Sequence, residues 1–354
     1  DAAVFIGNTE IVNILINSNF NIVNMCNDNT GHTPLMIASI FGYRDIVKLL
    51  IQNAALLDDQ DKSGGTALMK AAYNGHYDIV VDLAQQNCII GAEDKEGFCA
   101  LLLALMNGHQ KVASYLLDFG ANFTVPSAEG DSPFFLALMA DASDVVSAML
   151  QFEIVLDEQS GRHKQSIFHR LMIFCDEETV MKYLELFRKV INTVDYTIKN
   201  RMGQPALFYA AHFNYIKVLK FLLDNGTDVF TTDRNQNKVL HFCSTGEAVD
   251  IVIQKMKDTA SPMLLAQEIN SPNNQGNTPM HIAYAFGDSG MIQSLIKHGG
   301  DLNAKNKYGN IPHHMKLADR RRLLPLYLVD EEAPKCGGVH IGEVFTIVDP
   351  LIVL

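Results

Sequence analysis

Short apolar segments alternate with polar turns along most of the chain, and the clearest example runs from Gly31 to Ala55. Apolar residues recur there at helical spacing after Thr33, and a second helical pattern begins after Gly42. Thr33 can accept a hydrogen bond from the free N–H groups that open a helix, and Pro34 follows at the first helical position, where no N–H is needed. Gly42 permits the positive φ that ends a short helix. The segment therefore predicts two short amphipathic helices back to back.

The same pattern recurs at a nearly constant period. The positions equivalent to Thr33 are Thr66, Cys99, Ser132, Ser166, Pro205, Lys238, Thr278 and Ile311. The steps between them are 33, 33, 33, 34, 39, 33, 40 and 33 residues. The segment Ala3–Val12 aligns with Ala38–Val47, so the chain opens partway through a further copy. We therefore expect about ten units, of which the first is truncated.

A period of 33 residues with a Thr-Pro-Leu-His-x-Ala core is typical of ankyrin repeats, and this chain resembles that family. The resemblance rests on the core segments Thr33–Ala38, Thr66–Ala71 and Thr278–Ala283 and on the unit ends Asp118–Asn122 and Asp224–Asp228. It implies an all-α solenoid of stacked helix-turn-helix units with hairpin loops, in which each unit contacts its neighbours.

One position of the repeat is expected to be buried between units throughout. Its residues are Leu35, Leu68, Leu101, Phe134, Phe168, Leu207, Leu240 and Met280. The turn between the two helices is expected to depend on glycine, which stands at Gly42, Gly75 and Gly108. Asp141 takes this place in the next unit and predicts an altered turn there. Cys175 replaces the glycine in the unit after that.

Departures from the period predict the domain organisation. We expect a repeat array over 1–324, with insertions near 177–200 and 255–272 that lie between a second helix and the following hairpin. A non-repeat tail over 325–354 follows, in which Glu343–Val348 has the composition of a short β-strand. The tail either covers the last repeat or pairs with the sheet edge of another chain. The partial first unit also suggests a fragment of a longer protein.

Composition narrows the class of partner and the compartment. The chain has 40 acidic and 28 basic residues and a net charge of −12, which disfavours nucleic acid as a partner. Its six cysteines are scattered without a CxxC pair, which favours free thiols in the cytoplasm. No apolar run approaches the ~20 residues that cross a bilayer, so we expect no membrane insertion.

The sequence contains none of the motifs that mark common catalytic sites, such as GxSxG, GxxxxGK[ST], HExxH or GxGxxG. We therefore expect no enzyme, no cofactor and no metal. A zinc site is the alternative for His313, His314, Cys336 and His340, but their spacing matches no familiar zinc finger.

Histidines in the fourth position of the repeat core are expected to be structural. They are His169, His241 and His281. The resemblance implies that they form hydrogen bonds between neighbouring hairpins rather than acting as metal ligands or acid–base groups.

Partner binding is expected on the concave face that the first helices and hairpin tips form in ankyrin stacks. Five of the seven first-helix ends in this register contain an aromatic residue, and aromatics and methionine are enriched at interface centres. The candidate residues are Phe41, Tyr73, Asn74, Met106, Met139, Phe174, Phe213 and Phe286. They either line an apolar groove or pack against neighbouring units. The tips Asp61–Ser63, Asp94–Glu96 and Asp233–Asn235 mix charges and predict polar contacts at the rim.

These observations predict a non-enzymatic scaffold that binds protein partners on its concave face. The alternative is a targeting or regulatory segment of a larger enzyme, ubiquitin-ligase adaptor or channel. A catalyst within these residues is the least favoured reading, because an open repeat stack has no enclosed cavity that would exclude water from a reaction.

Overall fold

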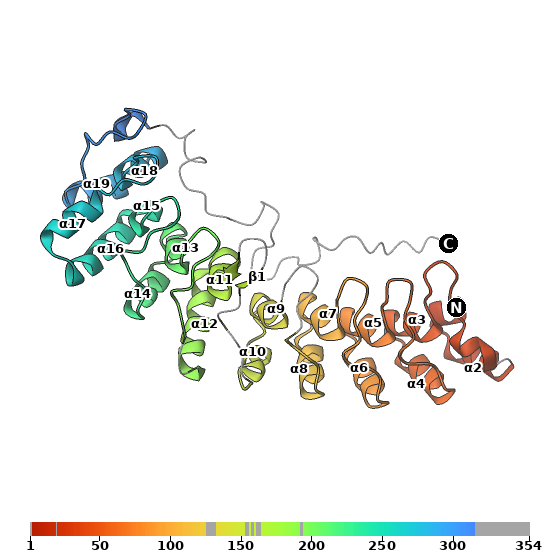
Figure 1. Ribbon diagram of the computed structural model, residues 1–354. Coiled ribbons are helices and arrows are strands. Elements are labelled where there is room, and N and C mark those ends of the chain that lie inside the picture. Colours follow the sequence, from red (N-terminus) through yellow and green to blue (C-terminus); the bar gives the residue numbers. More distant parts are fainter. Residues whose placement is uncertain are drawn as a thin grey trace. The chain divides into compact units, whose positions relative to one another are not determined.

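The computed structural model describes residues 2–18, 20–124, 132–152, 156, 159–160, 164–191 and 194–315 (Figure 1). The tail over 325–354, with its predicted strand, lies outside these residues, as do Cys336 and His340. The repeats divide into two compact units, and the boundary along the chain falls between Ile154 and Val155. We call them the N-terminal unit and the C-terminal unit and describe each by itself.

Pairs of short helices build the N-terminal unit. Its elements are α1 (Ala2–Phe5), α2 (Thr9–Ser18), the 3-10 helix η1 (Phe20–Asn24), α3 (Pro34–Phe41), α4 (Arg44–Gln52), α5 (Ala67–Tyr73), α6 (Tyr77–Ala84), α7 (Ala100–Met106), α8 (Gln110–Asp118), α9 (Pro133–Met139) and α10 (Ser143–Met149). Figure 1 shows α3, α5, α7 and α9 in one row and α4, α6, α8 and α10 in a second row. We call the outer side of the first row, where the hairpin loops lie, the first-helix face. The outer side of the second row is the second-helix face.

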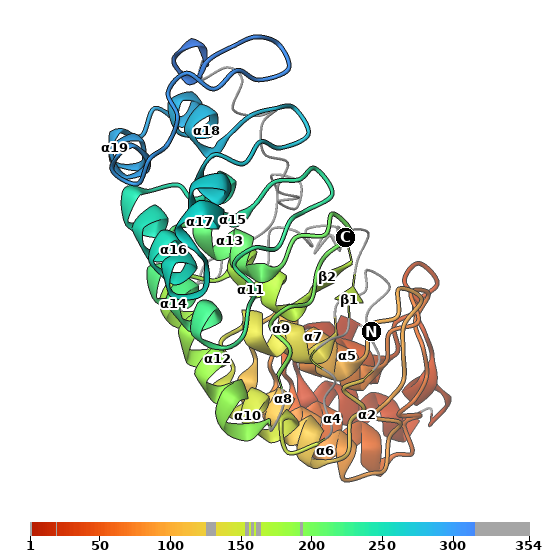
Figure 2. The ribbon, with the colours of Figure 1, turned by 60° about the vertical axis from the view of Figure 1, so that its left-hand side comes forward.

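The C-terminal unit also consists mainly of helix pairs, with two long second helices. They are β1 (Gln159–Ser160), β2 (Gln165–Ser166), α11 (Ile167–Phe174), α12 (Glu177–Val190), α13 (Ala206–His212), α14 (Ile216–Asp224), α15 (Val239–Phe242), α16 (Gly246–Thr259), α17 (Pro262–Ile269), α18 (Pro279–Phe286), α19 (Ser289–Lys297) and the 3-10 helix η2 (Pro312–His314). β1 pairs antiparallel with β2, with Gln159 opposite Ser166. Figure 2 shows the hairpin loops of this unit on the side of α13, α15 and α18 that faces away from α16 and α19.

The two stretches that lengthen the period carry extra helix. α12 and α16 each run for 14 residues, whereas the other second helices from α4 to α19 have seven to nine. The second stretch also folds into α17, an additional helix of eight residues that only the irregular step after Lys238 accommodates. The regular spacing of the other units leaves no residues for such an element.

Local chemistry sets the ends of the first helices as the sequence indicates. The Thr33 hydroxyl accepts from the Met36 N–H at 3.3 Å, and Gly42 ends α3 with a φ of 77°. The altered turn predicted at Asp141 is wrong, because Asp141 adopts a φ of 49° and keeps the left-handed turn. Aspartate and asparagine enter this conformation more readily than most residues. Cys175, with a φ of −109°, does lose it.

The buried position of the repeat is confirmed in both units. Its eight residues, Leu35, Leu68, Leu101, Phe134, Phe168, Leu207, Leu240 and Met280, are exposed by at most 5%. A first helix of seven or eight residues buries too little surface to be stable alone, so its stability comes from packing against its neighbours.

Six of the described hairpin loops are held by an acidic or amide side chain five residues before the first-helix cap. Asp61 Oδ1 accepts from the backbone N–H groups of Ser63 and Gly65, both at 2.8 Å. The same pair of bonds recurs at Asp94, Asn200, Asp233, Asn273 and Asn306. Asp61 and Asp233 are only 7% and 3% exposed, so the prediction that they make rim contacts is wrong.

The structural role predicted for the three core histidines is confirmed. His169 Nδ1 accepts from the Ser166 N–H at 3.2 Å, and its Nε2 donates to the carbonyl oxygen of Gln204 in the next hairpin at 2.8 Å. His241 and His281 make equivalent bonds. Burial lowers the pKa of His169 and His241 to about 4, so the rings are neutral at pH 7.

Candidate functional site

The ends of α3 and α5 present two partly exposed aromatic rings on the first-helix face. Phe41 and Tyr73 are the last residues of these helices, and each is 39% exposed. The Phe41 ring meets Phe5 edge to face at 4.9 Å and stacks on Tyr43 at 5.8 Å. Three rings from two adjacent repeats therefore form one apolar surface at the start of the N-terminal unit.

The other candidates in the N-terminal unit differ in exposure. Asn74 is exposed, and its side-chain amide donates to the Lys70 carbonyl oxygen at 2.8 Å, so it also ends α5. Met106 is only 7% exposed, and Met139 is half-buried. At the Met106 position the side chain packs inside the stack, which is the alternative that the sequence left open.

The three candidates in the C-terminal unit, Phe174, Phe213 and Phe286, are half-buried. Two of them lie near the same histidine. The ring of His212 lies 5.3 Å from Phe213 and 6.5 Å from Phe286. The intervening helix α15 has only four residues, so α13 and α18 share this contact across it. Phe174 lies elsewhere in the unit, with the Arg170 guanidinium 6.0 Å from its ring centroid.

Three rings that the sequence did not single out each join one repeat of the N-terminal unit to the repeat before it. Tyr43 Oη donates to the Phe5 carbonyl oxygen at 3.4 Å, and His76 Nε2 donates to that of Ile40 at 2.9 Å. His109 makes the equivalent bond to Tyr73 at 3.0 Å. These rings follow the turn glycine by one residue, and this regular position was the signal that could have identified them. They fix the first-helix ends that carry Phe41 and Tyr73.

A buried ion pair lies beneath the hairpins of the N-terminal unit. Asp61 Oδ2 lies 2.6 Å from Lys70 Nζ and 3.2 Å from His32 Nε2. Although burial opposes ionisation, hydrogen bonds from His32, Lys70 and Ser63 hold the pKa of Asp61 far below its usual range. The Asp61 carboxylate is therefore charged at neutral pH and ties α5 to two successive hairpins.

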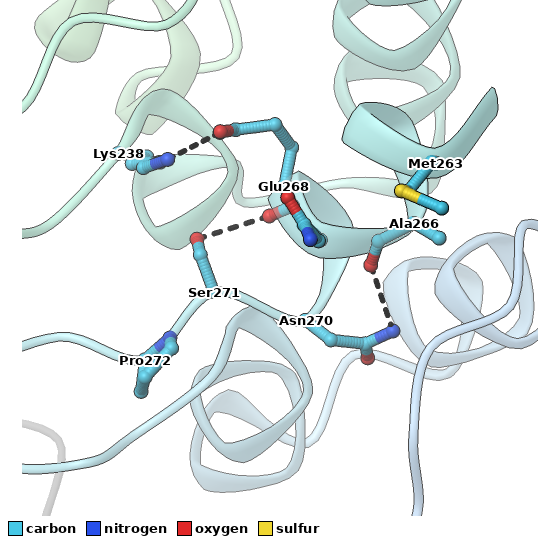
Figure 3. Close-up of a pocket in the computed structure, with 8 residues that line it drawn as sticks. Lys238, Met263, Ala266, Glu268, Asn270, Ser271 and Pro272 are labelled. Atoms are coloured by element: carbon cyan, nitrogen blue, oxygen red, sulfur yellow. Dashed lines mark hydrogen bonds and ion pairs between the residues drawn. The ribbon is translucent and has the colours of Figure 1, made fainter. Parts of the chain in front are cut away.

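An open hollow of about 710 Å³ lies beside the inserted helix α17 (Figure 3). It is lined by Lys238, Met263, Ala266, Gln267, Glu268, Asn270, Ser271 and Pro272. Lys238 Nζ donates to Glu268 Oε2 at 2.5 Å, and the Ser271 hydroxyl donates to the Glu268 carbonyl oxygen at 3.0 Å. Because its two charged groups are paired with each other, the hollow offers packing surface rather than acid–base chemistry.

The candidates for nucleophiles and metal ligands among the described residues include buried thiols and scattered side chains. Burial raises the pKa of the Cys88 thiol to about 12 and that of Cys243 still further, and a protonated thiol is a poor nucleophile. Within the same residues, no group of three or more His, Cys, Asp or Glu side chains is placed to hold a metal ion. His313 instead lies edge to face with Tyr284 at 5.9 Å.

Stacked helix pairs with capped first helices, left-handed turns and hydrogen-bonded hairpins define a helical repeat protein. Models of ankyrin repeats match residues 1–94, 68–160, 207–253 and 264–315. The chain belongs to the ankyrin-repeat family.

Relatives with similar sequences include proteins of several kinds. The chain is 25% identical over 141 residues to ankyrin repeat protein OPG189 of variola virus, which is 38% of this chain and 23% of that protein. It is 26% identical over 160 residues to palmitoyltransferase AKR1 of Lachancea kluyveri, covering 45% of this chain and 20% of the enzyme. Identity to rat NF-kappa-B inhibitor alpha is 26% over 140 residues, 39% of this chain and 43% of the inhibitor.

The chain thus spans less than half the length of each of these relatives. Ankyrin repeats generally mediate protein–protein interaction, and ankyrin-repeat domains are typically non-catalytic. In the portion of the chain that is described, no helix combines the length and apolar character needed to span a membrane.

Proposed function

We propose that this chain is a non-enzymatic scaffold that binds a protein partner on its first-helix face. The observation that carries the proposal is the partial exposure of Phe41 and Tyr73, 39% each, at the ends of adjacent first helices. The stack does not require an aromatic residue at this position, because Met106 occupies it in the next unit. Exposed aromatics at the centre of a patch are typical anchors of protein interfaces.

The N-terminal unit holds these anchors in a fixed arrangement before a partner binds. Hydrogen bonds from Tyr43, His76 and His109 fix the ends of the preceding first helices. Asn74 caps α5 and presents its remaining polar atoms beside Tyr73. A rigid surface loses little conformational entropy on association, which favours affinity. Apolar side chains of the partner would cover Phe41 and Tyr73, and hairpin charges such as Lys62 and Lys95 would form the polar rim.

The experiment is affinity capture of cellular proteins with the intact chain and with the Phe41→Ser/Tyr73→Ser double variant. We expect the double variant to lose specific partners while its thermal unfolding changes little, because both rings are already partly exposed. The matched control is Phe152→Ser, which removes a ring that is 60% exposed away from the first-helix ends. Loss of the same partners with Phe152→Ser, or a large fall in melting temperature of the double variant, would contradict the proposal.

The second candidate is a targeting or regulatory segment of a larger enzyme, ubiquitin-ligase adaptor or channel. It is favoured by the small share of each relative that the chain covers and by its similarity to one relative that is a palmitoyltransferase. Sequencing the full-length transcript tests it, since an additional catalytic or membrane domain in the same reading frame would support this candidate.

We also propose that the protein is cytoplasmic. Among the described residues, Cys26, Cys88, Cys99 and Cys243 are free thiols. Free thiols are typical of a reducing compartment. Fractionation of cells that express the tagged chain checks this, and recovery in the secretory fraction would contradict it.

A further inference from the structure

Three aromatic rings form a continuous surface on α6, on α8 and on the residue that caps α8, on the second-helix face of the N-terminal unit. Tyr77 meets Tyr115 edge to face at 5.7 Å, and Tyr115 stacks on Phe119 at 5.6 Å. The two outer rings are well exposed, Tyr77 by 41% and Phe119 by 43%, whereas Tyr115 is half-buried between them. We call these three residues the aromatic surface.

The stacking of the units does not explain the aromatic surface. Tyr77 and Tyr115 are separated by the same 38 positions as Arg44 and Asp82, which join α4 to α6 by an ion pair at 2.6 Å. The equivalent place between neighbouring second helices thus accepts either a charged pair or two rings. A charged pair is the usual choice for an outer surface, and clustered exposed rings are typical of an interaction site.

Carboxylates border the aromatic surface at both ends. Asp78 follows Tyr77 directly, with its side chain 67% exposed, and Asp118 precedes Phe119 and is also exposed. Lys111 on α8 is the single basic residue on these two helices, against Asp78, Asp82 and Asp118. The described residues of the N-terminal unit carry 14 acidic and six basic side chains, so the surrounding field is negative.

α6 already binds one guanidinium group within the protein. Arg44 Nε donates to Asp82 Oδ2 at 2.6 Å, and its Nη1 lies 3.3 Å from Asp78 Oδ1. Guanidinium groups also stack on aromatic faces and pair with carboxylates through a planar set of N–H donors. Rings flanked by carboxylates provide both contacts for a further arginine.

We propose that the aromatic surface binds a basic segment of a protein partner, whose arginine side chains stack on Tyr77 and Phe119 and pair with Asp118. Apolar side chains between the arginines would cover Tyr115. A second copy of this chain fits poorly, because it would bring acidic surfaces together. This site is separate from the one proposed on the first-helix face.

The test uses fluorescein-labelled peptides of alternating arginine and leucine, with lysine–leucine and glutamate–leucine peptides for comparison. Anisotropy titrations of the full chain should show binding of the arginine peptide, weaker binding of the lysine peptide and none of the glutamate peptide. Tyr77→Ser/Phe119→Ser should weaken binding of the arginine peptide by about tenfold or more. Asp118→Asn should weaken it several-fold and reduce its dependence on salt.

The control variant is Tyr73→Ser, four residues before Tyr77 and similarly exposed, but at the end of a first helix. It should leave binding of the arginine peptide unchanged while it reduces partner binding at the first-helix face. The two proposals can therefore be tested independently. Equal binding to the intact chain and to Tyr77→Ser/Phe119→Ser overturns the proposal, as does equal binding of the arginine and lysine peptides. Sedimentation that shows dimers of the intact chain but not of the double variant also overturns it, because the occupant would then be a second copy.

Discussion

The imidazole ring of His76 lies so close to Gly42 of the preceding unit that a Cβ atom there would meet His76 Cε1 at 2.7 Å. Gly75 and His109 repeat this relationship 33 residues later, with a Cβ-to-Nδ1 distance of 2.5 Å. At these turns glycine serves two purposes, since it adopts a positive φ and leaves room for the ring of the next unit. That ring then donates its hydrogen bond to the end of the preceding first helix.

Gly42→Ala is expected to destabilise the protein more than Gly108→Ala. Both changes place a Cβ at a positive φ, which costs about 1–2 kcal/mol. Only Gly42→Ala also displaces a ring and its hydrogen bond, for about 1 kcal/mol more, because no neighbouring atom of the described residues lies within 4 Å of the Cβ position at Gly108. Urea denaturation of the two variants measures the difference, and equal losses would contradict this account of the ring.

Leu68→Ala is expected to cost ~2–5 kcal/mol, because Leu68 is only 2% exposed and its loss leaves a cavity between α5 and its neighbours. Most contacts of a repeat are with adjacent repeats, so the damage should begin locally. Hydrogen exchange should show faster opening of α5 and α6 than of the C-terminal unit. Uniform acceleration across the whole chain would argue for a single cooperative unit.

Acid should destabilise the C-terminal unit through its core histidines. His169 and His241 have a pKa of about 4 when folded, below the usual 6.5, because burial disfavours the charged ring. Between these values the unfolded chain binds protons that the folded chain does not, so stability falls as pH drops from about 6.5 to 4. The loss is at most roughly 3 kcal/mol per histidine.

Hydrogen exchange at pH 7 and pH 5 measures this effect separately in each unit. The equivalent core positions of the N-terminal unit are Met36, Met69, Leu102 and Phe135. The groups near the histidines include Lys238, which also lowers the pKa of His241, and Asp301, which opposes the lowering at His281. His241→Phe should reduce the pH dependence of the stability of the C-terminal unit. An unchanged dependence would show that other groups cause it.

The buried carboxylate of Asp61 should matter more than that of Asp94. Both close their hairpins through two backbone N–H groups, but only Asp61 also pairs with Lys70 and His32. Lys70→Met is expected to cost ~3 kcal/mol because it leaves a buried charge with one partner fewer. Thermal unfolding of Lys70→Met, Asp61→Asn and the double variant measures the coupling, and additive losses would show that the pair contributes little.

Much of the fold could be predicted because its signals are local and repeated. The caps at Thr33 and Thr66, the buried row from Leu35 to Met280 and the histidine bonds follow from residue chemistry at fixed positions in the period. Asp141 was misjudged because the prediction treated positive φ as specific to glycine. α17 was not predicted, since only Glu268 and Ile269 of its eight residues are buried and so few buried positions leave no period to detect.

The candidate site was less predictable than the fold, for a physical reason. For the described residues, the sequence by itself determined the helix pairs, their order and the residues that end most first helices, because these depend on short-range periodicity and backbone conformation. Exposure depends on neighbouring side chains from other repeats: Tyr73 and Met106 share one position of the period, yet one is 39% and the other 7% exposed. Only packing in three dimensions separates a binding surface from an interior contact at such positions, because it sets which side chains fill the space between adjacent units.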